Sequence, residues 1–318
     1  MKIKNVTVAG GGVLGSQIAF QSAFKGFDVN VWLRSEGSVD RAKPRFDALK
    51  ETYLSILDRI KVGLSDENTV NSVIIPRGIS SDQLTLDDIE NLKKDVEEGF
   101  NRIHLLTDLE KSVENCDLLI EAVSENPEQK SDFYKNLAKV LNDNTIVATN
   151  SSTLLPSSFK DLLPHPEKYL ALHFANEIWN NNTAEIMGHS ETSHEVYDEV
   201  VNFAKDIGMI PLKLKKEQPG YLLNSLLVPL LDAAMTLKAL DIADIEDIDN
   251  AWRYGTGAPF GPFQILDVVG LKTAYNITLN KPDVNDENSV TYQIAQMLKK
   301  YIDENKLGRG TKEGFYKY

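Results

Sequence analysis

Residues 6–16 read V-T-V-A-G-G-G-V-L-G-S, and this stretch decides how the first part of the chain folds. The β-branched apolar residues at its start predict a buried strand, and the residues from Ser16 to Lys25 predict a helix. Between them, three glycines form the pattern G-x-G-x-x-G. Such glycines allow a tight turn, let backbone N–H groups approach a pyrophosphate, and let helix and strand pack closely. A purely structural turn is the alternative, but the position between strand and helix favours dinucleotide binding. The predicted cofactor contacts in this loop are Gly10, Gly12, Val13, Leu14 and Gly15.

The end of the second predicted strand, residues 27–33, bears on the choice of dinucleotide. Proteins that bind NAD usually carry Asp or Glu there, which accepts hydrogen bonds from the adenosine ribose. This chain instead reads Leu33-Arg34-Ser35-Glu36. Leu33 cannot accept a hydrogen bond, whereas Arg34 and Ser35 are suited to hold a 2′-phosphate. The cofactor is therefore predicted to be NAD or NADP, with a slight lean to NADP. The alternative is NAD with its ribose met by Ser35 or Glu36.

The composition limits the classes of partner. The chain has 318 residues, 42% of them hydrophobic, and a formal net charge of −13. This charge argues against nucleic acid or an anionic membrane surface as the main partner, but not against an anionic cofactor. The single cysteine, Cys116, is expected to be buried and predicts no disulfide within the chain. No apolar run reaches membrane-spanning length, and a cytoplasmic location is expected.

Strands and helices alternate through the first two thirds of the chain. Apolar residues at helical spacing predict two helices over 39–62 and 86–96, joined by a polar loop over 65–82. Further strands are expected at 103–106, 117–123, 145–149, 169–174 and 183–187, with a helix from Pro127 to about Leu141. This alternation predicts a Rossmann-type α/β domain over residues 1–215, doubly wound around a mostly parallel sheet, with a helical hairpin insertion near 39–100. Glu125, Ser152 and His173 fall at or just beyond strand ends, where such sheets bind ligands.

The pattern changes after Leu214, and no alternating strand follows. Helices are expected over 220–241, from Asp244 onwards, over 263–269 and over 289–301, so residues 216–318 are predicted to form an all-helical domain. The segment 220–240 is apolar around much of its circumference. This predicts a homodimer formed through the helical domain.

Motifs spread over nearly the whole chain carry a family resemblance. Besides the glycine loop they are E-A-V-S-E-N (121–126), T-N-S-S (149–152), L-H-F-A-N (172–176), P-G-Y-L-L-N-S-L-L-V-P (219–229), G-P-F-Q-I-L-D-V-V-G-L (261–271) and E-G-F-Y-K-Y (313–318). In order and spacing they resemble the 3-hydroxyacyl-CoA dehydrogenase family, including its 3-hydroxybutyryl-CoA members.

Alcohol oxidation needs a base for the hydroxyl proton, and histidine suits this role near neutral pH. Among the five histidines, His173 alone ends a predicted strand of the sheet. Glu185 lies on the next predicted strand, where its carboxylate could orient the imidazole. His173 and Glu185 are therefore the predicted catalytic pair. A structural histidine and a solvated carboxylate are the alternatives.

The resemblance implies roles for further residues. Ser152, otherwise interpreted as a helix N-cap, would hydrogen-bond the substrate oxygen, and Asn224 would complete the substrate contacts. The positions implied to lie near the cofactor are Glu125, Lys130, Asn150 and Asn176. No metal is implied.

The implied reaction is reversible hydride transfer between NAD(P) and a (3S)-3-hydroxyacyl-CoA, giving the 3-oxoacyl-CoA. The basic helix from Arg41 to Lys61 would receive the CoA phosphates. However, Asn176 is followed by Glu177-Ile178-Trp179-Asn180-Asn181-Asn182, where the family commonly has Pro and an apolar run. This polarity keeps open a free polar hydroxy acid as substrate, as in the gulonate- and carnitine-type relatives. A non-catalytic, crystallin-like dinucleotide-binding protein is the third alternative.

Overall fold

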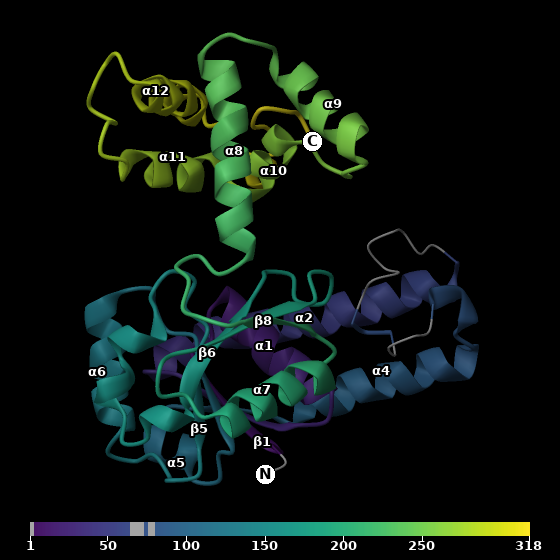
Figure 1. Cartoon of the computed structure of the whole chain (residues 1–318). Helices are drawn as coiled ribbons and strands as arrows, with labels where there is room; N and C mark the ends of the chain where they lie inside the picture. The colour runs from purple at the N-terminus through teal and green to yellow at the C-terminus, as the bar shows by residue number, and fades with distance from the viewer. Residues whose placement is uncertain (1–2, 64–72, 76–79) are drawn as a thin grey trace. The chain divides into compact units, whose positions relative to one another are not determined.

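The computed structural model describes residues 3–63, 73–75 and 80–318, in two compact units that divide between Leu222 and Leu223. The first unit is an α/β domain and the second is helical, as the sequence predicts (Figure 1). None of the described helices is both long enough and apolar enough to cross a membrane.

The described part of the first unit contains an eight-stranded sheet with the order β3-β2-β1-β4-β5-β6-β7-β8. All neighbouring strands pair in parallel except β6 and β7, which pair antiparallel. The predicted mostly parallel, doubly wound sheet is confirmed. The strands are β1 (Asn5–Ala9), β2 (Asp28–Trp32), β3 (Ile103–Leu106), β4 (Leu118–Glu121), β5 (Ile146–Thr149), β6 (Tyr169–Phe174), β7 (Thr183–Gly188) and β8 (Ile210–Leu214).

Strand β8 has no counterpart in the sequence prediction. It is short, and it contains Pro211, which lacks the N–H that an interior strand would need. Among the described strands it pairs with β7 alone, at the edge of the sheet, and this position makes the proline acceptable.

Helices cover both faces of the sheet (Figure 1). One apolar core joins the sheet to four helices, and a smaller core joins the other face to two more. The first four are α1 (Val13–Phe24), α2 (Glu36–Lys61), α4 (Leu86–Asn101) and α7 (His194–Asp206); the other two are α5 (Leu109–Val113) and α6 (Pro127–Leu137). Cys116 is buried at the entry to β4, and burial raises the pKa of its thiol to about 12, so a nucleophilic role is not supported.

Helices α2 and α4 form the predicted hairpin and lie side by side (Figure 1). Tyr53 of α2 is fully buried, and its hydroxyl donates to Gln21 of α1 at 2.6 Å. Two of the basic residues on α2 are paired with acidic residues of α4, Lys50 with Glu97 and Lys61 with Glu90. Most of the loop predicted over 65–82 lies outside the described residues.

The helical unit comprises α8 (Leu223–Ala239), α9 (Ile245–Thr256), α10 (Pro262–Val269), α11 (Leu271–Leu279) and α12 (Val290–Asp303). Its C-terminal residues are held by the buried carboxylate of Asp267, which accepts hydrogen bonds from the backbone of Phe315 and Tyr316 and from the hydroxyl of Tyr318. Helix α8 begins at Leu223 rather than at the predicted Gly220. Gly220 and Tyr221 have φ values of 78° and 55°, which are incompatible with a right-handed helix.

Candidate active site

The glycine loop connects β1 to α1 and has the shape that its sequence predicts. Gly10 has a φ of 124°, and a Cβ there would lie 2.4 Å from the carbonyl oxygen of Ala122. A Cβ on Gly15 would lie 2.2 Å from the carbonyl oxygen of Gly10, so both positions require glycine. Gly12, in contrast, faces open space, and the N-terminus of α1 has no side-chain cap. This leaves room and unpaired N–H groups for a pyrophosphate, so the loop fits a dinucleotide.

A cavity of about 570 Å³ opens beside this loop. Its walls come from the loop, from the end of β2, from the start of α2, from the residues after β4, and from α6. The lining residues include Gly10, Gly11, Gly12, Trp32, Leu33, Arg34, Ser38, Arg41, Arg45, Asp132 and Asn136.

Two arginines and a serine lie at one end of this cavity, where its wall is formed by the end of β2 and the start of α2. Arg34, Ser38 and Arg41 line the cavity, and Arg41 Nη2 donates to Ser38 Oγ at 2.9 Å. Leu33 is buried beneath Gly11. Glu36, the alternative ribose ligand, accepts from Thr107 Oγ1 at 3.1 Å and does not line the cavity. The lining carboxylate, Asp132, comes from α6 and not from the end of β2.

Eight of the eleven predicted cofactor residues do not line this cavity: Val13, Leu14, Gly15, Ser35, Glu125, Lys130, Asn150 and Asn176. Ser35 precedes α2, and its Oγ lies 3.1 Å from Ser38 Oγ. Ser38, one turn further along the chain, is the serine that lines the cavity. Val13 and Leu14 form the first turn of α1, where backbone N–H groups rather than side chains face a phosphate.

His173 and Glu185 are direct cross-strand partners on β6 and β7. Both side chains are buried, with exposed fractions of 8% and 3%. The imidazole Nδ1 lies 2.9 Å from Glu185 Oε2, while Glu185 Oε1 accepts from the backbone N–H of Leu222 at 2.8 Å. Since a carboxylate only accepts hydrogen bonds, the imidazole Nδ1–H donates to Glu185, and Nε2 is the nitrogen that can exchange a proton with a ligand.

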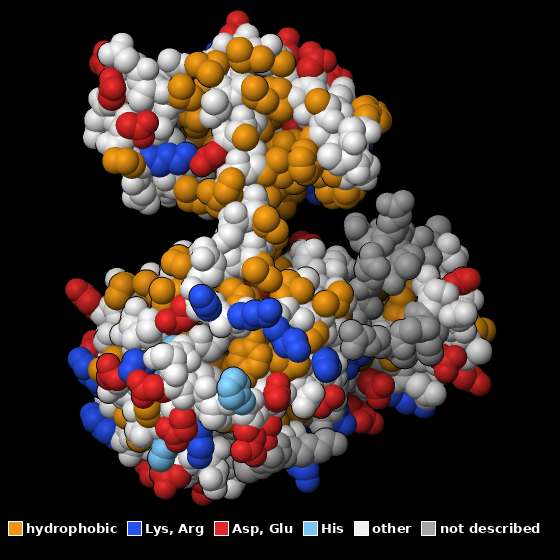
Figure 2. Space-filling model, viewed as in Figure 1, with side chains coloured by type: hydrophobic (Ala, Val, Ile, Leu, Met, Phe, Trp, Pro, Cys, Tyr) orange, Lys and Arg blue, Asp and Glu red, His pale blue; other side chains and the backbone are white. Residues whose placement is uncertain are grey.

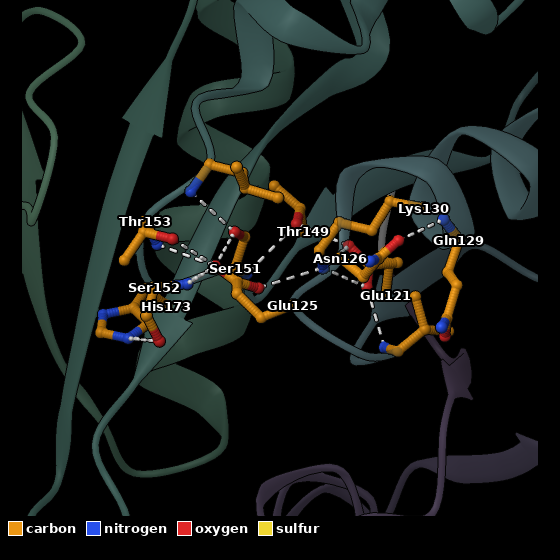
Figure 3. Close-up of polar contacts among 12 residues, drawn as sticks. Glu121, Glu125, Asn126, Gln129, Lys130, Thr149, Ser151, Ser152, Thr153 and His173 are labelled. Atoms are coloured by element: carbon orange, nitrogen blue, oxygen red, sulfur yellow. Dashed lines mark hydrogen bonds and ion pairs between the residues drawn. The ribbon is translucent and has the colours of Figure 1, made fainter. Parts of the chain in front are cut away.

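Ser152 lies on the Nε2 side of the imidazole, with its Oγ at 3.2 Å (Figure 3). Glu125 holds the loop that carries Ser152. Its Oε1 accepts from Ser151 Oγ, from the N–H groups of Ser152 and Thr153, and from Thr153 Oγ1, at 2.5 to 3.1 Å. Burial acts to raise the pKa of the Glu125 carboxyl, but the hydrogen bonds from Ser151 and Thr153 and the charge of Lys130 outweigh it, so the pKa is lowered. The Glu125 carboxylate therefore organises the serine loop.

The Lys130 side chain is buried and does not line the cavity. Its Nζ donates to both carboxylate oxygens of Glu121, at 2.7 and 2.9 Å, and lies 3.4 Å from Glu125 Oε2. Glu121 also accepts from Tyr134 and Thr149 (Figure 3 shows the Thr149 contact). This network ties β4, α6 and β5 together. Lys130 is therefore tied to the serine loop through Glu125, and its place near the cofactor stays a prediction.

The predicted asparagines lie in different settings. Asn150 follows β5, and its Oδ1 accepts from the N–H of Phe174, which links the ends of β5 and β6. Asn176 is exposed in the loop after β6, where its carbonyl accepts from Asn181. Asn224 is half-buried in α8 of the helical unit. Its substrate contact stays a prediction.

The structure does not gather the basic residues of α2 into one surface. Lys50 and Lys61 are paired with α4, whereas Arg41 and Arg45 line the cavity at the glycine loop. Arg45 donates to the carbonyl of Gly11 at 3.1 Å and so braces the loop itself.

An alcohol loses its hydride and its proton in one reaction. A proton-accepting imidazole at the same edge of the sheet as a dinucleotide loop therefore defines a dehydrogenase. Comparison with known proteins agrees. Residues 5–218 match the model of the 3-hydroxyacyl-CoA dehydrogenase NAD binding domain, and residues 220–318 match that of its C-terminal domain. The chain belongs to the 3-hydroxyacyl-CoA dehydrogenase family and is an oxidoreductase of that family.

Individual relatives cover nearly the whole chain. The human mitochondrial hydroxyacyl-coenzyme A dehydrogenase is 33% identical over 99% of this chain and 91% of its own length. A 3-hydroxybutyryl-CoA dehydrogenase of Clostridioides difficile is 27% identical over 98% of this chain and 99% of its own length. Among solved structures, a diketoreductase described as a dual catalyst of dicarbonyl compounds is 45% identical, with a TM-score of 0.84 and full coverage of both chains.

Proposed function

We propose that this protein catalyses reversible hydride transfer between NADP(H) and carbon 3 of a (3S)-3-hydroxyacyl-CoA, giving the 3-oxoacyl-CoA. The observation that carries the proposal is the imidazole of His173, held between Glu185 at 2.9 Å and Ser152 at 3.2 Å. This arrangement lies at the carboxyl ends of the parallel strands, the edge from which the glycine loop also emerges.

In the oxidising direction, Nε2 of His173 would accept the proton of the substrate hydroxyl. A nicotinamide dinucleotide held at the glycine loop would supply the hydride acceptor. The carboxylate of Glu185 keeps the Nδ1 proton in place and balances the charge of the imidazolium. The hydroxyl of Ser152 donates a hydrogen bond to the substrate oxygen, where negative charge develops as the proton leaves. In the reducing direction His173 returns the proton. By resemblance, Asn224 is proposed to bind the substrate as well.

The lean to NADP is supported by the groups at the end of β2. Arg34 and Arg41 bring positive charge and Ser38 brings a hydroxyl, the combination that binds a phosphate monoester well. Leu33 replaces the acid that would hydrogen-bond a free 2′-hydroxyl, and Glu36 is engaged with Thr107.

A free dicarbonyl compound is the second candidate substrate. The diketoreductase relative acts on dicarbonyl compounds, and a 3-oxoacyl thioester is itself a 1,3-dicarbonyl, so the reacting group is shared. The loop 176–182 is rich in amides, and the pairing of Lys50 and Lys61 with α4 leaves fewer cations on α2 for CoA phosphates. These observations keep the free dicarbonyl compound as the second candidate beside the CoA ester.

The test is a four-way assay in which loss of reduced-nicotinamide absorbance is followed with NADPH or NADH, on acetoacetyl-CoA or on a free 1,3-diketone. We expect the largest kcat/KM for NADPH with acetoacetyl-CoA. A larger kcat/KM for the free 1,3-diketone than for acetoacetyl-CoA would instead identify the free dicarbonyl compound as the substrate class. No turnover in any of the four reactions, from protein that binds dinucleotide, would favour the crystallin-like alternative.

A further inference from the structure

Tyr221, the penultimate residue of the first unit, lies against the catalytic histidine. The rings of Tyr221 and His173 are stacked, with centroids 4.6 Å apart and planes inclined by 19°. Tyr221 is 1% exposed, so its ring has no freedom to leave this contact without opening the core. One face of the imidazole is thereby fixed, in addition to its Nδ1 edge.

The hydroxyl of Tyr221 reaches the other catalytic group. It donates to the carbonyl oxygen of Ser151 at 2.7 Å. Ser151 directly precedes Ser152, whose Oγ lies 3.2 Å from Nε2 of His173. A single side chain therefore contacts the imidazole with its ring and the peptide that carries the serine with its hydroxyl.

The backbone beside Tyr221 contributes a third contact. The N–H of Leu222 donates to Glu185 Oε1 at 2.8 Å, the oxygen that does not face His173. To make these contacts together, Tyr221 adopts a φ of 55°, a conformation that bulky residues rarely take. Such outliers persist where surrounding contacts over-determine the backbone, and they cluster at functional sites.

We propose that Tyr221 is a positioning residue for the proton transfer: its ring sets the plane of the His173 imidazole and its hydroxyl sets the distance from Ser152 to Nε2. This inference rests on the proposed function, in which His173 and Ser152 meet the substrate oxygen. Tyr221 does not itself act as the acid. Burial raises the pKa of its hydroxyl, and its proton is committed to the Ser151 carbonyl.

Two substitutions separate the two contacts. Tyr221→Phe keeps the ring and removes the hydroxyl, whereas Tyr221→Leu removes both. We expect kcat to fall about fivefold to tenfold in Tyr221→Phe, the effect of one hydrogen bond. A fall of about a hundredfold is expected in Tyr221→Leu, because the imidazole loses its alignment. The KM for the dinucleotide should change in neither variant, since Tyr221 does not line the cavity at the glycine loop. The matched control is Tyr316→Phe, which removes a tyrosine hydroxyl bonded to Asp249 in the helical unit and should leave kcat unchanged.

A spectroscopic measurement keeps the inference independent of the substrate. In protein labelled at histidine, with the signal assigned by His173→Gln, the ring protons of His173 should carry the upfield shift of a stacked aromatic neighbour. That shift should persist in Tyr221→Phe and disappear in Tyr221→Leu. Two results in folded Tyr221→Leu protein would overturn the inference: His173 ring-proton signals at the same positions as in the wild type, or a kcat within twofold of the wild-type value. If the wild type reduces none of the proposed substrates while the His173 shift behaves as expected, the proposed function fails and the stacking contact stands.

Discussion

His173 and Glu185 occupy the same register position on β6 and β7, so the sheet itself brings Nδ1 to within 2.9 Å of the carboxylate. A shift of one residue in the pairing of these strands would turn one of the two side chains to the opposite face. The buried apolar residues that flank the pair, Leu172 and Phe174 on β6 and Ala184 and Ile186 on β7, prevent such a shift. The geometry of the catalytic pair is therefore set by the packing of the core.

Replacing either member of this pair should reduce turnover with little effect on folding. We expect His173→Gln to lower kcat by about 10²- to 10⁴-fold, the usual contribution of a general acid–base group. Glu185→Gln should lower it by about 10²-fold or more. The amide oxygen would accept from Leu222 N–H, and the amide NH₂ would then donate to Nδ1 and force the imidazole proton onto Nε2. Steady-state kinetics test this, with His194→Gln at the exposed start of α7 as the control. Full activity in His173→Gln would remove this residue from the mechanism.

The choice of dinucleotide should depend on Arg34 and Arg41. In the variant Arg34→Gln/Arg41→Gln we expect KM for NADPH to rise about 10- to 100-fold, from the loss of charge-assisted hydrogen bonds. KM for NADH should stay nearly constant, because NADH lacks the 2′-phosphate. Lys43→Gln is the matched control, since Lys43 lies on the same helix and does not line the cavity. If the KM values for NADPH and NADH rise equally, these arginines do not act by binding the 2′-phosphate.

The serine loop should be sensitive to acid through Glu125. Because the folded-state pKa of this carboxyl is lowered from 4.5, its ionised form stabilises the fold at pH values above 4.5, and that stabilisation is lost as the pH falls through the folded-state value. The free energy of unfolding of the wild type, minus that of Glu125→Gln, should thus be largest above pH 4.5 and shrink in more acidic solution. Chemical denaturation over a pH series measures this difference. Glu128→Gln, at an exposed position of the same segment, is the matched control for the loss of a carboxylate.

The sequence predicted the parts of the site that depend on local pattern. The glycine loop follows from the steric needs of a strand–turn–helix unit, and the two strand ends that carry His173 and Glu185 follow from apolar runs. Ser38 was not predicted, although a helix beginning near Glu36 would place it in the first turn of α2, close to Ser35. The burial of Lys130 between Glu121 and Glu125 depends on contacts among β4, α6 and the serine loop, which periodicity does not reveal.

Tyr221 shows a different limit of sequence reasoning. It stands in P-G-Y-L-L-N-S, where the apolar residues that follow predict the start of a helix. Its actual φ of 55° is imposed by tertiary contacts to His173 and Ser151, which lie far away in the sequence. Helix propensity is a weak guide where such contacts compete with it.

The apolar surface of the helical unit bears on assembly, and we propose that two copies of the chain associate through it. Hydrophobic side chains gather over α8 in Figure 2, and Leu226, Ile242 and Val268 are 75%, 66% and 58% exposed. Burying such residues stabilises an interface. Sedimentation velocity should therefore give the mass of a dimer, and the variant Ile242→Asp/Val268→Asp should give more monomer. A wild type that sediments as a single species of monomer mass would refute the proposal.

Lys25 offers a test of the fold with a defined pH window. This residue follows α1, and its Nζ lies 4.7 Å from the centre of the Phe24 ring. Burial lowers the pKa of its ammonium from 10.5 to about 8, against the opposing charge of Asp95. The folded protein therefore loses this proton at a lower pH than the unfolded chain does. Below pH 8 both states carry the proton, and the full cost of burying the charge reduces stability. Between pH 8 and 10.5 the unfolded state binds more protons, so the free energy of unfolding rises with pH.

Lys25→Met keeps the length of the side chain and removes its charge, so we expect it to raise the free energy of unfolding near neutral pH. The upper limit is about 3 kcal/mol, at roughly 1.4 kcal/mol for each pKa unit. This advantage should shrink as the pH rises from 8 towards 10.5, because the wild-type lysine is then neutral in the folded state as well. Comparing the two proteins at each pH cancels the titration of all other groups. Lys94→Met, at an exposed position of α4, is the matched control for the loss of a lysine charge. A Lys25→Met variant that is less stable than the wild type at neutral pH would mean that contacts of the ammonium outweigh its desolvation.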